Sequence, residues 1–172
     1  MKIRKTMKNH SLILWVIRRA LAQQNQKVLR KYNRHVSVGD LIFDRWKTAL
    51  DYGFGTGTTC YNNVLIIGDV QVGKNCWIGP NVVLDGSGGK LEIGDFVSIS
   101  SGVQIYTHNT VEWSNSMGVA KKKTGSVNIG SGTYIGPNAI ISLGVSVGNQ
   151  CVIGALTFVD KSLPNNSSKI GN

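Results

Sequence analysis

The segment 129–163 reads IGSGTYIGPNAIISLGVSVGNQCVIGALTFVDKSL and places an aliphatic residue at every sixth position. The same spacing extends upstream over 66–84 and 93–105, with a nine-residue step between these two runs and a longer interruption before 129. Every position in this register is Ile, Val or Leu: Ile66, Val72, Ile78, Leu84, Ile93, Ile99, Ile105, Ile129, Ile135, Ile141, Val147, Ile153 and Val159. A glycine commonly follows, and a slim residue stands four positions after the aliphatic.

A period of six residues fits neither an α-helix, which repeats about every 3.6 residues, nor the two-residue alternation of a strand. It fits a solenoid in which each hexad forms one short flat side and one corner. The aliphatic residue then points into a narrow core, and coils about 4.8 Å apart stack like residues on like. We expect the glycines at corners, where a Cβ would clash or φ must be positive.

Three stretches carry a resemblance to a known family: VGKNCWIGPNVVL (72–84), IGDFVSISSGVQIYTH (93–108) and the segment 129–163. They resemble the hexapeptide-repeat acyltransferases, in particular the galactoside, maltose and virginiamycin-type O-acetyltransferases and the surface-polysaccharide O-acetyltransferases. The resemblance implies an all-β solenoid, namely a left-handed parallel β-helix, assembled as a homotrimer with acetyl-CoA as acyl donor. The left hand comes from the family, because the general rule for parallel crossovers predicts a right-handed one.

The sequence divides into four expected segments. A basic N-terminal helical segment covers 1–35, a lead-in or cap covers 36–65, the β-helix covers 66–163 with one long protruding loop at 109–128, and a C-terminal tail covers 164–172. Within the lead-in, residues 35–43 look like a strand or an irregular coil, and residues 44–52 like a short helical turn. We expect the lead-in to cover the open end of the solenoid, where unpaired strand edges would otherwise be exposed.

The net charge of +10 is confined to the N-terminus. Residues 1–34 hold ten Lys or Arg and no Asp or Glu, and the remainder holds nine of each sign. The solenoid is therefore not a nucleic-acid binder. The basic segment is predicted to be a helix over 9–33, capped by Asn9 or Ser11 and apolar on one face. Docking on the trimer, contact with an anionic membrane and contact with nucleic acid remain open as its roles; for the whole protein we expect no nucleic-acid partner.

The run Leu12 to Ile17 is too short for a signal peptide or a membrane-spanning helix. We therefore expect a cytoplasmic protein, with peripheral attachment to the inner face of the membrane as an open alternative. The three cysteines show no CxxC spacing, and Cys76 and Cys151 occupy the slim inward position of their hexads. They are read as buried small residues in a reducing compartment.

His108 is the one histidine of the solenoid, at the point where the hexad register breaks. It matches the catalytic histidine of the family, so the resemblance implies that it is the general base. An imidazole can take the proton from an acceptor hydroxyl or amine during its attack on the thioester. No nucleophile triad is visible, which favours direct transfer, and Glu112 is a weak candidate to orient the ring. A single histidine also excludes the three-histidine zinc site of β-helical carbonic anhydrases, so no metal is predicted.

The resemblance also carries coenzyme A contacts onto the last run of hexads: Tyr134, Pro137, Ala155, Asp160 and Lys161. Lys161 is the candidate phosphate contact. The acceptor-binding candidates are Asn81, Asp85 and Trp113, because carboxylates and amides bind sugar hydroxyls and an aromatic ring stacks on a pyranose. The glycine-rich step at 85–89 either lines this pocket or is a tolerated bulge.

The sequence thus favours an acetyl-CoA-dependent O-acetyltransferase that acts on a sugar hydroxyl in lipopolysaccharide or surface-polysaccharide biosynthesis. Its partners would be acetyl-CoA and a carbohydrate acceptor. Three alternatives stay open: an amino-sugar N-acetyltransferase, a small-molecule or antibiotic O-acetyltransferase, and a non-catalytic trimeric β-helix scaffold.

Overall fold

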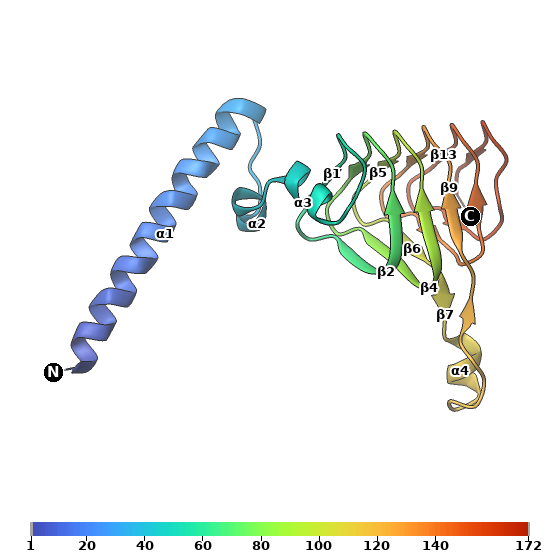
Figure 1. Cartoon of the computed structure of the whole chain (residues 1–172), viewed down its shortest axis with the longest axis horizontal. Helices are drawn as coiled ribbons and strands as arrows, with labels where there is room; N and C mark the ends of the chain where they lie inside the picture. The colour runs from blue at the N-terminus through green and yellow to red at the C-terminus, as the bar shows by residue number, and fades with distance from the viewer. Residues whose placement is uncertain (1, 172) are drawn as a thin grey trace. The chain divides into compact units, whose positions relative to one another are not determined.

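The computed structural model describes residues 2–171, with side chains described for 11–171. It divides into two compact units, and the division along the chain falls between Asp44 and Arg45. The first unit contains α1 (Lys2–Tyr32) and α2 (Val38–Ile42) (Figure 1). Helix α1 begins before Asn9, so the predicted start of the helix is wrong. The strand or irregular coil predicted for 35–43 is also wrong, because Ser37 caps a short helix there by accepting a hydrogen bond from the Asp40 amide at 3.3 Å.

The second unit opens with α3 (Arg45–Asp51), as predicted for this stretch, and continues almost entirely in short strands. The strands are β1 (Thr59–Cys60), β2 (Leu65–Val72), β3 (Trp77–Ile78), β4 (Val83–Ile93), β5 (Ser98–Ile99), β6 (Gln104–Tyr106), β7 (His108–Asn109), β8 (Lys123–Thr124), β9 (Val127–Ile129), β10 (Tyr134–Ile135), β11 (Ile140–Ile141), β12 (Ser146–Val147), β13 (Val152–Ile153), β14 (Phe158–Val159) and β15 (Ser168–Lys169), with α4 (Val111–Asn115) between β7 and β8. Helix α3 packs on β1 and buries Ala49 in the core shared with the strands.

The strands form a parallel β-helix, in which the chain visits three sides in turn. The first side stacks β1, β3, β5, β10, β13 and β15. The second side stacks the first residues of β2 and β4 with β6, β11 and β14. The third side stacks the last residues of β2 and β4 with β9 and β12. Because β15 pairs with β13, the stack continues past residue 163, where the sequence predicted a tail.

The predicted aliphatic ladders are confirmed. Ile78, Ile99, Ile135 and Ile153 lie in successive register positions of the first side, and each is fully buried. The glycines after them allow close approach of the next coil: a Cβ on Gly136 would lie 2.5 Å from the backbone nitrogen of Ala155. Burial of each such aliphatic side chain favours the folded state by roughly 1.5–3 kcal/mol.

Two departures from the regular coil occur at the same corner, between the second and third sides. Strand β4 bulges over 87–90, where its register against β2 shifts between Gly68 and Val70. In the next coil the chain leaves the stack as an arm, built from the antiparallel ribbon β7–β8 and the short helix α4 (Figure 1). The interruption at 109–128 is therefore a structured hairpin with a helical tip.

The burial of the three cysteines predicts that their thiols are unreactive in the folded protein. Cys60, Cys76 and Cys151 are at most 2 % exposed, and desolvation raises the pKa of Cys60 to about 12. Since the thiolate is the reactive form, Ellman's reagent at pH 8 should modify none of them in the folded protein and all three after unfolding in guanidinium chloride. Fast reaction of a thiol in the native protein would show that the coils open locally or that the core packs differently.

Candidate active site

His108 begins β7, at the base of the arm, with its side chain about one quarter exposed. Its Nδ1 lies 3.0 Å from Oδ2 of Asp85, whose side chain is almost completely buried. The Oγ of Ser87 lies 3.2 Å from the same Nδ1. Asp85 and Ser87 belong to β4, in the coil before the one that carries His108. The glycine-rich step and the histidine, far apart in the sequence, are therefore neighbours.

The bulge of β4 and the base of the arm hold each other through buried hydrogen bonds. The hydroxyl of Thr107, fully buried, donates to the carbonyl of Asp85 at 2.8 Å and accepts from the amide of Gly88 at 2.9 Å. The amide of Ser87 donates to Oδ1 of Asp85 at 2.8 Å. A Cβ on Gly88 would lie 2.5 Å from Cβ of His108. The bulge must therefore carry glycine at this position for the histidine to occupy its place.

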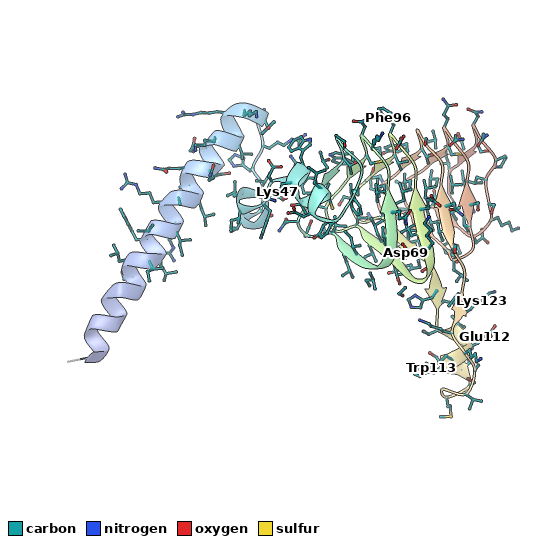
Figure 2. The ribbon with its side chains drawn as sticks, in the orientation of Figure 1. Lys47, Asp69, Phe96, Glu112, Trp113 and Lys123 are labelled. Atoms are coloured by element: carbon teal, nitrogen blue, oxygen red, sulfur yellow. The ribbon has the colours of Figure 1, made fainter. Side chains whose placement is uncertain are left out.

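This arrangement selects one form of the imidazole. A carboxylate can only accept hydrogen bonds, so Nδ1 of His108 carries the proton that it donates to Asp85. In the neutral ring Nε2 then bears the lone pair. An imidazole held in this way can accept a proton at Nε2, and the carboxylate stabilises the imidazolium that results. Glu112, the weak sequence candidate for this role, lies on α4 in the arm (Figure 2). The acid beside the ring is Asp85.

The residues predicted to contact coenzyme A lie on several parts of the β-helix. Tyr134 points outward from the first side, and its hydroxyl accepts a hydrogen bond from Ser100 Oγ at 3.4 Å. Pro137 and Ala155 are exposed in successive coils at the corner between the first and second sides. Asp160 and Lys161 are exposed at the corner that carries His108, two coils further along, which is roughly 10 Å at the usual strand spacing.

Asp160 is engaged by a cation that the sequence did not single out. Lys169 Nζ lies 3.1 Å from Oδ1 of Asp160, and this hydrogen bond holds the pKa of Asp160 below its usual value. Lys169 lies on β15, in the stretch expected to be a tail.

The three predicted acceptor residues do not come together. Asn81 lies at the corner between the first and second sides, where its backbone has φ +58° and its side chain accepts from Asn63 Nδ2 at 2.7 Å. Asp85 is directed to His108. Trp113 is half-exposed on α4, away from the base of the arm where Lys123 lies (Figure 2).

Sequence reasoning missed Ser87, Gly88 and Thr107 as neighbours of the histidine. The signal that could have found them is the length of the coil. Inward residues of the second and third coils lie 21 residues apart, as in the pair Leu84 and Ile105, and Ser87 and His108 are also 21 residues apart.

Part of the β-helix is similar in sequence to known proteins. Residues 126–161 match the hexapeptide repeat of succinyl-transferase. The chain carries hexapeptide repeats over this stretch. It is 35 % identical over 88 residues, 49 % of its length, to the bifunctional protein GlmU of Geotalea uraniireducens, and 34 % identical over 104 residues, 60 % of its length, to a Staphylococcus aureus protein named as an acetyltransferase. The chain spans 18 % of the first relative and 52 % of the second.

Solved structures of acyltransferases share its fold. AntD, an N-acyltransferase from Bacillus cereus in complex with dTDP and coenzyme A, superposes with a TM-score of 0.60 at 25 % identity, over 69 % of this chain and 67 % of AntD. The acetyltransferase domain of PglB from Neisseria gonorrhoeae, with acetyl-CoA bound, gives a TM-score of 0.55 at 18 % identity, over 69 % of this chain and 48 % of the domain. The predicted resemblance to hexapeptide-repeat acyltransferases is confirmed.

The contact between Asp85 and His108 predicts a tautomer that can be measured directly. Nitrogen-15 NMR of the imidazoles should show His108 with a protonated Nδ1 and an unprotonated Nε2 when the ring is neutral. Asp85→Asn can offer an amide hydrogen to Nδ1 and should shift the ring toward the Nε2-protonated form. Glu112→Gln is the matched control and should leave the tautomer unchanged. An unchanged tautomer in Asp85→Asn would contradict the assigned contact.

Proposed function

We propose that the chain is an acetyl-CoA-dependent O-acetyltransferase that acts on a sugar hydroxyl, with His108 as general base. The observation that carries this proposal is the imidazole held by a buried carboxylate at the corner where the β-helix departs from its regular coil. The repeat and the acyltransferases among the related proteins and structures supply the donor class.

The reaction that fits this geometry is direct transfer. The acceptor oxygen attacks the thioester carbonyl while its proton moves to Nε2 of His108. The C–S bond then breaks, and the sulfur of coenzyme A leaves with the proton that the imidazolium returns. Asp85 holds Nδ1–H throughout and stabilises the positive charge on the ring without taking the proton. In this proposal Asp85 positions the base, and Asn81 and Trp113 remain the candidates for acceptor binding.

We propose a left-handed homotrimer as the functional assembly. Large apolar side chains point outward from the second side of the β-helix, among them Leu65, Ile67 and Phe158, which are 52 %, 39 % and 45 % exposed. Burial against another copy would remove this apolar surface from water. Coenzyme A would then lie between neighbouring copies, with Tyr134, Pro137 and Ala155 along the pantetheine. Asp160 and Lys161 would lie near its phosphates, with the lysine as the cation for them.

A second candidate is transfer to an amine. The AntD structure, at 25 % identity, is described as an N-acyltransferase in complex with dTDP and coenzyme A. A general base serves an amine as well as a hydroxyl, because either nucleophile loses a proton during the transfer. The two acceptor classes share one base and differ in the reacting atom of the sugar, so a role in lipopolysaccharide or surface-polysaccharide assembly fits both.

Replacement of the base tests the mechanism. His108→Ala should lower kcat by roughly 10²–10⁴-fold, the usual contribution of a general base, while coenzyme A binding measured by calorimetry survives. Thiol release from acetyl-CoA is the assay, and the buried cysteines of the protein do not compete for the thiol reagent. Glu112→Gln is the control and should retain its turnover. Full turnover in His108→Ala would show that another group is the base.

The choice of acceptor needs a matched pair of substrates. Two nucleotide-linked sugars should be compared that differ at one carbon, where one bears a hydroxyl and the other an amine. This pair distinguishes O-transfer from N-transfer, and chloramphenicol tests a small-molecule acceptor. Turnover of the hydroxyl sugar alone supports the proposal, and turnover of the amine alone supports the second candidate. Coenzyme A binding without turnover of any acceptor would favour the non-catalytic scaffold.

A further inference from the structure

Helix α1 carries a belt of apolar side chains that the first unit leaves exposed. Six consecutive residues from Leu12 to Ile17 are all Leu, Ile, Val or Trp, and each is between 48 % and 60 % exposed. Six residues of helix turn through more than one and a half turns, so the belt surrounds the helix at this level. By contrast, Leu21 and Val28 further along are only partly exposed, in the same unit as α2.

Cations flank the belt on both sides, and acidic residues are absent around it. Lys8 precedes it, and Arg18 and Arg19 follow it directly. The first acidic residue of the chain is Asp40, on α2. The guanidinium of Arg19 lies 5.2 Å from the centre of the Trp15 ring, a pairing of aromatic ring and cation that suits the boundary between apolar and polar surroundings.

This charge pattern separates the candidate occupants of the belt. A second copy of α1 would bring like charges together with no carboxylate on the helix to pair them, a cost that would oppose its association through the belt. An anionic bilayer supplies both an apolar interior for the belt and phosphates for the flanking cations.

The length of the belt fits insertion into the surface of a bilayer. Six residues span about 9 Å along a helix axis, enough for a helix that lies in the plane of the bilayer surface to bury one to two turns of apolar side chains to a depth of roughly 5–10 Å. Crossing the hydrocarbon layer takes about 20 apolar residues, and none of the helices in the described part of the chain has the length and apolarity for it.

We propose that the segment from Leu12 to Arg19 binds the surface of an anionic phospholipid bilayer, with the apolar belt in the headgroup boundary and the arginines on the lipid phosphates. This surface is independent of the proposed acyl transfer, because it uses no residue of the site around His108. The segment gives the chain a second binding activity, for a membrane.

Sedimentation with vesicles tests the proposal. The full-length protein should bind phosphatidylcholine vesicles that contain 30 % phosphatidylglycerol at low salt, and should bind pure phosphatidylcholine vesicles at least tenfold more weakly. The combined substitutions Arg18→Gln and Arg19→Gln should weaken binding to the anionic vesicles by roughly tenfold or more. Lys121→Gln with Lys122→Gln removes the same charge from the arm and should have less than a twofold effect.

The fluorescence of Trp15 locates the contact. Brominated anionic lipids should quench the emission of the protein, and Trp15→Phe should remove most of that quenching. Trp113→Phe, at a position with similar exposure on the arm, should leave it in place. Absence of vesicle binding at low salt, or an equal loss in the lysine control, would overturn the proposal. The proposal would also be overturned if the arginine substitutions changed only the oligomeric state or only DNA binding.

Discussion

The structure depends on the requirement that every coil place its aliphatic residues directly over those of the coil before. Register positions such as Ile99, Ile135 and Ile153 are fully buried and stack without offset. A residue added within a side would shift every following side chain between core and solvent. Extra residues can therefore enter only at corners, and the two insertions of this chain enter at one corner in adjacent coils. The position of the candidate site follows from this constraint.

That corner also explains why a buried carboxylate is tolerated. An unpaired charge in the core would cost several kcal/mol, yet Asp85 is only 2 % exposed. Its Oδ1 accepts the amide of Ser87, and its Oδ2 faces Nδ1 of His108. The bulge of β4 supplies the first of these partners and the arm supplies the second. Removal of either insertion would leave the carboxylate without part of its hydrogen bonding, so the stability of this corner and the orientation of the His108 ring rest on the same contacts.

The sequence predicted the repeating part of the molecule well and the irregular part poorly, for a physical reason. The ladder positions recur at a fixed period and are all aliphatic, so each can be assigned without knowledge of its neighbours in space. Asp85 was predicted to bind the acceptor. Its contact with His108 was missed because the two residues are 23 positions apart in the chain, across a coil whose length the insertion alters. Local rules also failed at 35–43, where the hydrogen bond from the Asp40 amide to Ser37 caps a short helix despite the apolar alternation of this stretch. His108 was predicted as the base because it is the one histidine of the solenoid, stands where the register breaks and matches the catalytic histidine of the family that the sequence resembles.

The second unit is close to neutral, which limits how it could hold the phosphates of coenzyme A. Cations near the proposed phosphate end are few, and one of them, Lys169, already pairs with Asp160. This pair is partly exposed, so its net contribution to stability is small, and a phosphate could take the place of the carboxylate at modest cost. Lys169 therefore joins Lys161 as a candidate phosphate contact. In the proposed complex, β15, the strand that extends the stack beyond its predicted end, would supply this second cation.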